Sequence, residues 1–145
     1  MGPREPGGAA RRSGANERLM RRFLDTTIAI DYLRGDEAAL AWVERLFEAG
    51  DTPIVNDVVV CELATGAPSA DDPGLAAFLR AVEYVQPGPD VAALAGRWRG
   101  DARRRGVTIS APDALIAACA AAQDAAVVTH NARDFAAMPV DVETY

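Results

Sequence analysis

Four acidic residues hold positions from which their carboxylates can act together: Asp25, Glu62, Asp113 and Asp134. Asp25 follows a first apolar run that is typical of a strand, and Glu62 lies on the helix expected after the second strand. Asp113 opens an alanine-rich helix ahead of a fourth strand, and Asp134 follows that strand. In a doubly wound sheet these positions converge at the carboxyl edge of the strands.

Such a set of carboxylates indicates a site for a divalent metal ion. Converging carboxylates repel one another unless a cation lies between them. The chain has one histidine and two isolated cysteines, so the candidate ligands are mainly oxygens. This chemistry favours Mg²⁺ or Mn²⁺ over zinc.

Asp25 taken alone also has a purely structural explanation. Residues Arg21–Leu24 are expected to form a strand, and Ile28–Leu33 to continue as a helix that ends near Gly35. Asp is among the best N-cap residues, so Asp25 can simply cap this helix. The metal-site interpretation therefore depends on the other three acids lying close by.

Short apolar runs alternate with helical patterns along the rest of the chain. Four further strands are expected at 53–55, 82–85, 126–129 and 140–144, and helices at 36–49, 56–66, 75–81, 89–105 and 112–123. A turn and a short helix are expected at 130–135. This alternation predicts an α/β fold with a parallel sheet.

Length and composition predict one domain with an N-terminal extension. Of the 145 residues, those at 1–19 are rich in Gly, Pro, Arg and Ala and are expected to be disordered, which leaves 20–145 as the domain. No apolar run has the length of a membrane span, so no membrane association is expected. Cys61 and Cys119 lie in apolar helical patterns and are expected to be core residues in a reducing cytoplasm.

Basic residues gather on one predicted helix. All fifteen basic residues are arginine, and the formal net charge of -6 argues against a surface coated with phosphate-binding cations. The later turns of the helix at 89–105 nevertheless carry an arginine cluster, which consists of Arg97, Arg99, Arg103, Arg104 and Arg105. The cluster is explained equally by a solvated helix face near the negative end of the helix dipole and by contacts with RNA phosphates.

Around the four acids the sequence resembles the PIN-domain ribonucleases, especially the toxins of VapBC-type toxin–antitoxin pairs. The matching fragments occur in family order and cover essentially residues 20–145. They are Phe-Leu-Asp-Thr at 23–26, Glu62-Leu63 with Gly66, Asp-Ala-Leu-Ile-Ala-Ala at 113–118, and Thr-His-Asn-Ala-Arg-Asp-Phe at 129–135. Each fragment alone is weak, but four in order are specific.

The resemblance implies both a fold and an activity. The fold is a PIN-like three-layer α/β/α sandwich with a mostly parallel four- to five-stranded sheet. The activity is hydrolysis of RNA phosphodiester bonds that leaves 5′-phosphate and 3′-hydroxyl ends, with Mg²⁺ or Mn²⁺ held by the four acids. The family pattern also implies a homodimeric cytoplasmic toxin that a small VapB-type antitoxin neutralises, with the antitoxin's C-terminal segment in the active groove.

The resemblance assigns supporting roles as well. Thr26 and Thr129 would assist the acids through hydroxyl contacts, and Asn131 would orient the last turn. Thr27 and His130 depart from the residues common at these positions. Within the arginine cluster, independently of the resemblance, the candidate RNA contacts are Arg97, Arg103, Arg104 and Arg105.

Two other functions are compatible with parts of the sequence. A phosphatase or phosphotransferase of another α/β fold would use Asp25 as a nucleophile. Thr27 stands where one such family has a second acid, which weighs against this alternative. A non-catalytic binding module would keep the fold alone, and an intact set of four acids disfavours it.

Overall fold

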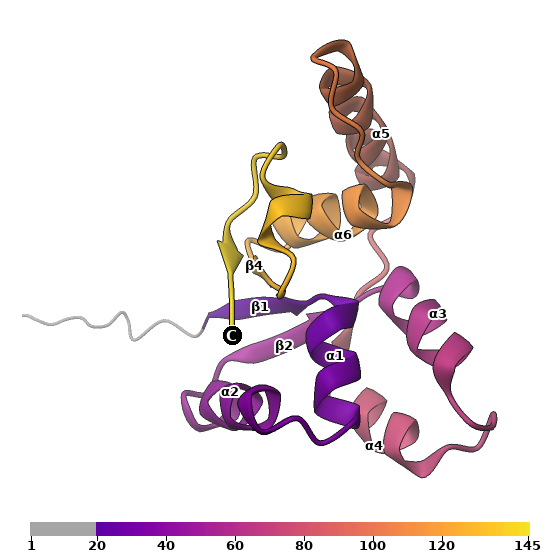
Figure 1. Ribbon diagram of the computed structural model, residues 1–145, viewed down its shortest axis with the longest axis vertical. Helices are drawn as coiled ribbons and strands as arrows, with labels where there is room; N and C mark the ends of the chain where they lie inside the picture. Colours follow the sequence, from indigo (N-terminus) through magenta and orange to yellow (C-terminus); the bar gives the residue numbers. More distant parts are fainter. Residues whose placement is uncertain (1–19) are drawn as a thin grey trace, which may run out of the picture.

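A five-stranded parallel sheet forms the centre of the protein (Figure 1). The computed structural model describes residues 20–145, so the prediction for residues 1–19 lies outside the described residues. The strands are β1 (Arg21–Leu24), β2 (Thr52–Val55), β3 (Glu83–Tyr84), β4 (Ala126–Val128) and β5 (Val142–Glu143). Their order across the sheet is β3-β2-β1-β4-β5, and every neighbouring pair is parallel.

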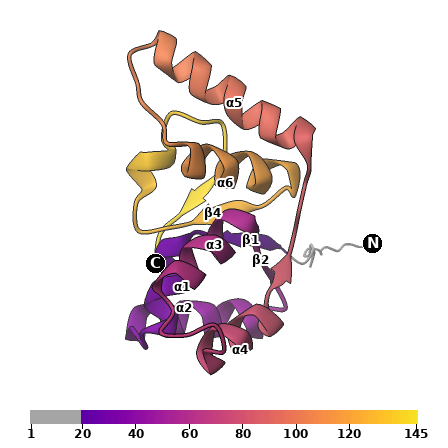
Figure 2. The ribbon, with the colours of Figure 1, turned by 90° about the vertical axis from the view of Figure 1, so that its right-hand side faces the viewer.

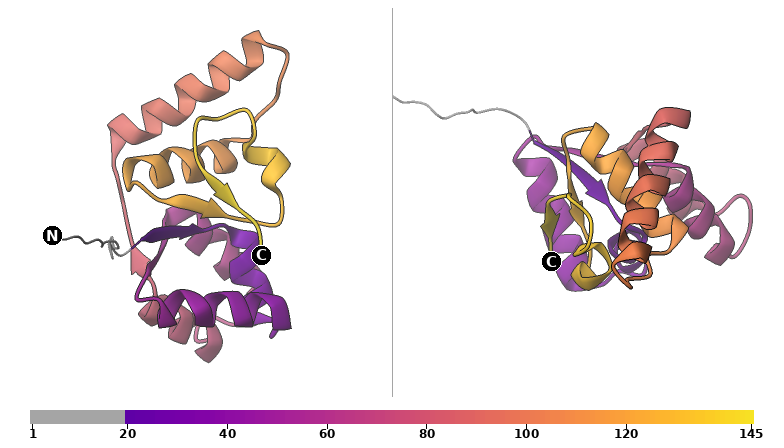
Figure 3. Two further views of the ribbon diagram at one scale, coloured as in Figure 1. Left: turned by 90° about the vertical axis from the view of Figure 1, so that its left-hand side faces the viewer. Right: turned by 90° about the horizontal axis from the view of Figure 1, so that it is seen from above.

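Helices cover both faces of the sheet. They are α1 (Thr26–Leu33), α2 (Glu37–Glu48), α3 (Asp57–Gly66), α4 (Pro73–Ala81), α5 (Pro89–Arg104) and α6 (Ala111–Ala122), with a 3₁₀ helix, η2 (Ala132–Phe135). Figures 1 and 3 show α1, α2 and α4 on one side of the sheet and α6 on the other, with α5 outside α6. Crossovers between parallel strands are right-handed, so a chain that first extends the sheet beyond β2 and then returns to place β4 beside β1 uses both faces. The predicted α/β sandwich is confirmed.

The central strands are apolar because both of their faces are covered. Phe23, Leu24, Ile54, Val127 and Val128 are all fully buried. The two edge strands are shorter than the expected 82–85 and 140–144, with two residues each. Strand pairing is most extensive in the middle of the sheet, where β1 pairs with both β2 and β4.

Side-chain caps fix where the helices begin. Asn56 accepts from the backbone N–H groups of Val58 and Val59 at 3.2 and 3.3 Å, which starts α3 in spite of its three consecutive valines. Ser110 accepts from the N–H of Asp113 at 3.2 Å, so α6 starts at Ala111 and Asp113 is its third residue. Asp113 is therefore not the cap of its helix.

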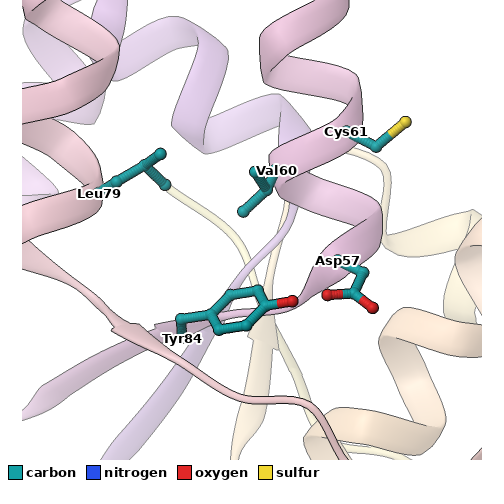
Figure 4. Close-up of a pocket in the computed structure, with 5 residues that line it drawn as sticks. All are labelled: Asp57, Val60, Cys61, Leu79 and Tyr84. Carbon is teal, nitrogen blue, oxygen red and sulfur yellow. The ribbon is translucent and has the colours of Figure 1, made fainter.

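The expectation that both cysteines lie in the core is wrong for one of them. Cys119 is buried in α6, whereas Cys61 is exposed on α3. Val59 and Leu63, four residues apart, face the core, and Cys61 halfway between them points away from it. Figure 4 shows its sulfur directed away from Leu79 across a surface pocket. Within residues 20–145, no helix combines the length and the apolar character needed to span a bilayer.

Candidate active site

Asp25 lies where the topology of the sheet reverses. β1 pairs with β2 on one side and with β4 on the other, so the connections that leave these strands diverge at their carboxyl ends. Ligand sites of open α/β sheets lie in the crevice that this divergence opens. The N–H of Asp25 donates to the carbonyl of Val128 at 3.1 Å, which fixes the residue at this edge.

The carboxylate of Asp25 is buried and held by three donors. Its side chain is the N-cap of α1 and accepts from the Thr26 N–H at 2.8 Å, so the capping explanation is correct as far as it goes. The Thr129 hydroxyl donates to the other oxygen at 2.7 Å, and the Thr27 hydroxyl does so at 3.3 Å. Burial raises the pKa of Asp25, these hydrogen bonds act against that rise, and the charge of Glu62 adds to it.

Glu62 reaches the same edge from α3. Its carboxylate accepts a hydrogen bond from the Thr26 hydroxyl, on the residue that follows Asp25. Glu62 itself is exposed, so one of its oxygens is tied to α1 while the group stays open to solvent. The hydroxyl contact expected of Thr26 is present, and it is made with Glu62.

The segment after β4 supplies the remaining support. Thr129 is fully buried, and its hydroxyl also accepts from the N–H of Asn131 at 2.9 Å. Asn131 precedes η2 but makes no side-chain capping bond, so its contact with the site comes from its backbone. Asp134, within η2, is exposed.

Asp113 lies in the first turn of α6, where the charges of the other three acids act on it. It is half-buried there. Burial raises its pKa, the hydrogen bond with Ser110 lowers it, and the negative charges of three neighbours raise it further. Those neighbours are Asp134, Asp25 and Glu62. That these four acids act together as one site stays a prediction.

The donors at this edge fit a hard divalent cation that keeps part of its water shell. Across residues 20–145, no group of three acidic, histidine or cysteine side chains lies close enough to enclose a metal ion directly. Mg²⁺ usually binds through one or two carboxylates and retains several waters, so it does not need such a cage. A buried carboxylate with exposed carboxylates beside it matches that preference.

The four arginines assigned to RNA all lie on the surface at α5 or just after it. Arg104 forms an ion pair with Asp101, and Arg105 donates to the carbonyl of Ala137 at 3.2 Å. Ala137 lies three residues after Asp134, so the end of α5 is close to the turn that follows η2. Arg97 and Arg103 are exposed along the same helix.

A cluster around His130 was not predicted from the sequence as a unit. The Tyr145 hydroxyl donates to Asp31 of α1 at 2.6 Å, and the rings of His130 and Tyr145 stack with centroids 3.7 Å apart and planes 9° apart. The N–H of His130 donates to the Thr27 hydroxyl at 3.3 Å. No local pattern could have revealed this cluster, because 114 residues separate Tyr145 from Asp31.

A pocket of about 310 Å³ opens beside Glu62, and its lining includes the charged residues Arg34 and Asp72 as well as apolar side chains. Ile30 and Leu33 of α1, Leu63 of α3 and Leu75 of α4 contribute its apolar lining. Figure 2 shows the three helices on the same side of the molecule. Glu62, one of the four acids, therefore lines this pocket together with apolar side chains.

A parallel doubly wound sheet with carboxylates near its carboxyl edge is the arrangement in which open α/β folds place their ligand sites, and comparison with known proteins identifies the family. The PIN domain family model matches residues 22–140. The chain is also 35% identical over 118 residues to Ribonuclease VapC19 of Mycobacterium tuberculosis, a match that covers 81% of this chain and 94% of that protein. The chain belongs to the PIN domain family.

Solved structures agree with this assignment. The chain aligns with VapBC2 from Rickettsia felis, bound to a DNA fragment from its promoter, with a TM-score of 0.77 and 24% identity over 87% of this chain and 99% of the other. It aligns with VapBC-5 of Mycobacterium tuberculosis, a member of the VapBC family of toxin–antitoxin systems, with a TM-score of 0.57 and 26% identity, covering 86% and 96% of the two chains. The fold is thus that of proteins solved as toxin–antitoxin systems.

Proposed function

We propose that this protein is a metal-dependent endoribonuclease that acts as the toxin of a type II toxin–antitoxin pair. Membership of the PIN domain family and similarity to a protein named as a ribonuclease support the activity. The observation that carries the proposal is the Asp25 carboxylate, which three donors hold at the carboxyl edge of the sheet beside Glu62, itself bound by the Thr26 hydroxyl. A non-catalytic binding module would gain nothing from four carboxylates that repel one another at one edge of the sheet.

In this proposal each acid has a role that follows from its surroundings. Asp25 is fixed by three donors and Asp113 is half-buried, so these two are the rigid ligands for Mg²⁺ or Mn²⁺. Glu62 and Asp134 are exposed, and they would bind the cation through its water molecules and orient the attacking water. When bound, the cation would lower the pKa of that water and neutralise charge on the phosphate.

The hydroxyl groups hold the acids in place. Thr129 and Thr27 keep one oxygen of Asp25 in a fixed direction, and Thr26 ties Glu62 to α1. Asn131 supports Thr129 through its backbone N–H. A single rotamer of Asp25 is thereby selected before substrate binds, which reduces the reorganisation that catalysis requires.

The phosphatase alternative is disfavoured by the same contacts. A nucleophilic carboxylate needs an oxygen that can reach the phosphorus of its substrate. Asp25 is only 5% exposed, and both of its oxygens are engaged by donors. A carboxylate held in this way is better suited to binding a cation than to forming a covalent phosphoenzyme.

The proposal includes a protein partner and a place of action. The pocket lined by Ile30, Leu33, Leu63 and Leu75 suits an apolar segment of a small antitoxin, which would then pass Glu62 and cover the acids. We place the toxin in the cytoplasm, as a homodimer, with RNA as its substrate. The exposed arginines of α5 would hold the RNA backbone.

Purified protein tests the activity. RNA incubated with the protein should be cut in Mg²⁺ or Mn²⁺ and left intact in chelator, and the products should carry 5′-phosphate and 3′-hydroxyl ends. Cleavage that persists in chelator, or products with 2′,3′-cyclic phosphate ends, would rule out metal-assisted attack by water. A covalent phosphate on Asp25 would instead establish the phosphotransferase alternative.

A further inference from the structure

The cluster of His130, Tyr145 and Asp31 presents an exposed aromatic surface beside the acidic edge. Tyr145 packs flat against one face of the His130 imidazole, at a centroid distance of 3.7 Å. The His130 side chain is nevertheless 47% exposed. Because one ring face is covered, the exposed area belongs to the opposite face and to the ring edge.

Tyr145 and its neighbours hold this ring in a fixed orientation. The Tyr145 hydroxyl donates to Asp31 at 2.6 Å, and Nε2 of His130 lies 3.2 Å from the backbone oxygen of Tyr145. Nδ1 of His130 lies 3.6 Å from the Asp31 carboxylate. Burial and the neighbouring Asp31 raise the pKa of the Tyr145 hydroxyl, so it stays protonated and remains a donor. An aromatic surface fixed in advance loses little entropy when a ligand stacks on it.

Two hydrogen bonds connect the backbone of His130 to the buried carboxylate of Asp25. The N–H of His130 donates to the Thr27 hydroxyl at 3.3 Å, and that hydroxyl donates to Asp25 at 3.3 Å. His130 also follows directly after Thr129, whose hydroxyl donates to Asp25 at 2.7 Å. His130 is therefore a near neighbour of Asp25, and a nucleotide next to a phosphate held at the acids would lie close to the imidazole.

We propose that the exposed face of His130, supported from behind by Tyr145 and Asp31, is a stacking subsite for one unpaired base of the RNA next to the cleaved bond. This inference rests on the proposed ribonuclease function and adds to it a requirement for an unpaired nucleotide at the cleavage site. Only an unpaired base can offer its flat face to a protein ring, and such stacking is independent of base identity. The subsite thus selects RNA structure rather than sequence.

A direct test uses the fact that the chain has a single histidine. The imidazole carbon-bound protons of His130 then give one resolvable set of NMR signals. Adenosine 5′-monophosphate should move these signals upfield in a saturable titration, because a stacked base shields protons that lie over its ring. Ribose 5-phosphate has the same sugar and phosphate without a base, and it should not do so. Equal shifts with both compounds, or none with either, would overturn the subsite.

Variants separate the supporting contacts from the ring itself. Tyr145→Phe keeps the stacked ring and should keep most of the upfield shift, whereas Tyr145→Leu should lose it. Phe47→Leu is the matched control, because Phe47 is another exposed aromatic side chain and lies on α2. A Tyr145→Leu protein that retains the full shift would contradict the role of Tyr145.

Cleavage provides a second and separate readout. His130→Ala keeps the backbone N–H that bonds Thr27, so it should raise KM for single-stranded RNA about fivefold or more and leave kcat nearly unchanged. An abasic nucleotide beside the cut bond should raise KM of the wild type by a similar factor and have no effect on His130→Ala. Active protein with no base dependence would overturn the subsite alone. A base-dependent NMR shift in protein that cleaves no RNA would overturn the proposed function and leave the subsite standing.

Discussion

Replacing Thr129 by valine removes the hydroxyl that donates to the buried carboxylate of Asp25 and accepts from the uncharged N–H of Asn131, so only the first of these bonds depends on the charge of Asp25. Valine has nearly the same shape as threonine, and Thr129 is fully buried, so the change removes a hydroxyl without opening a cavity. The bond to Asp25 is 2.7 Å long and joins the hydroxyl to a carboxylate that is 5% exposed. A hydrogen bond to a charged group contributes about 1.5–3 kcal/mol to stability, and one between neutral groups about 0.5–1.5 kcal/mol.

The size of the effect should therefore depend on pH. Burial raises the pKa of Asp25 above its value in the unfolded chain. Stability from this group is complete below the unfolded pKa and is lost as pH rises through the folded pKa, because the folded state binds the proton more tightly. Thr129→Val removes an interaction that favours the charged form. The substitution should therefore raise the pKa of Asp25 in the folded state further, and the stability lost above that pKa should be larger.

Urea unfolding in chelator at pH 7 and at pH 4 measures this difference. We expect Thr129→Val to lower the free energy of unfolding by about 1.5–3 kcal/mol at pH 7 and by about 0.5–1.5 kcal/mol at pH 4. Thr129→Ser keeps the hydroxyl and should lose less at pH 7 than the valine variant does. Thr108→Val makes the same chemical change at an exposed position and should stay within about 0.5 kcal/mol of the wild type. Equal losses at both pH values would refute a charged Asp25 held by Thr129.

Three further predictions concern the acids, the arginines and the N-terminal extension. Burial and neighbouring charges disfavour ionised Asp113, so Asp113→Asn should melt at a higher temperature than the wild type in chelator. Mn²⁺ at about 100 times its Kd should raise the free energy of unfolding of the wild type by about 2.7 kcal/mol and that of the variant by less. A variant that melts lower in chelator, with no response of either protein to Mn²⁺, would make Asp113 a structural residue. Replacing Arg103, Arg104 and Arg105 together with Gln should weaken RNA binding and flatten its salt dependence by about one log unit per lost phosphate contact, and an unchanged slope would leave these arginines as a solvated helix face. A chain that begins at Met20 should match the full chain in melting and in RNA cleavage, and a large loss of stability would show that residues 1–19 pack against the domain.

The sequence was informative wherever the determinants are local. The apolar residues before Asp25 and the cap at Asn56 lie next to the elements that they define, so β1 and α3 were predicted with nearly correct bounds. The three valines at 58–60 favour a strand by propensity, yet the cap and the inward packing of Val59 and Leu63 stabilise a helix.

Long-range features were harder to predict. That the acids share one edge depends on the order β3-β2-β1-β4-β5, which the alternation of strands and helices permits but does not determine. The stack of Tyr145 on His130 depends on where β5 returns, and no periodicity encodes that return. Cys61 was misjudged because an apolar run does not reveal which side of its helix faces the core.

Single-turnover cleavage of RNA in excess Mn²⁺ by Asp113→Asn and by Asp141→Asn tests the central claim most directly. Both variants lose one carboxylate charge and keep the size of the side chain, but Asp113 lies among the four acids and Asp141 is exposed just before β5. A metal site built from the four acids predicts that Asp113→Asn loses about a hundredfold or more in rate, while Asp141→Asn cleaves like the wild type. Equal rates for folded Asp113→Asn and the wild type would contradict the assignment of these carboxylates as the catalytic centre.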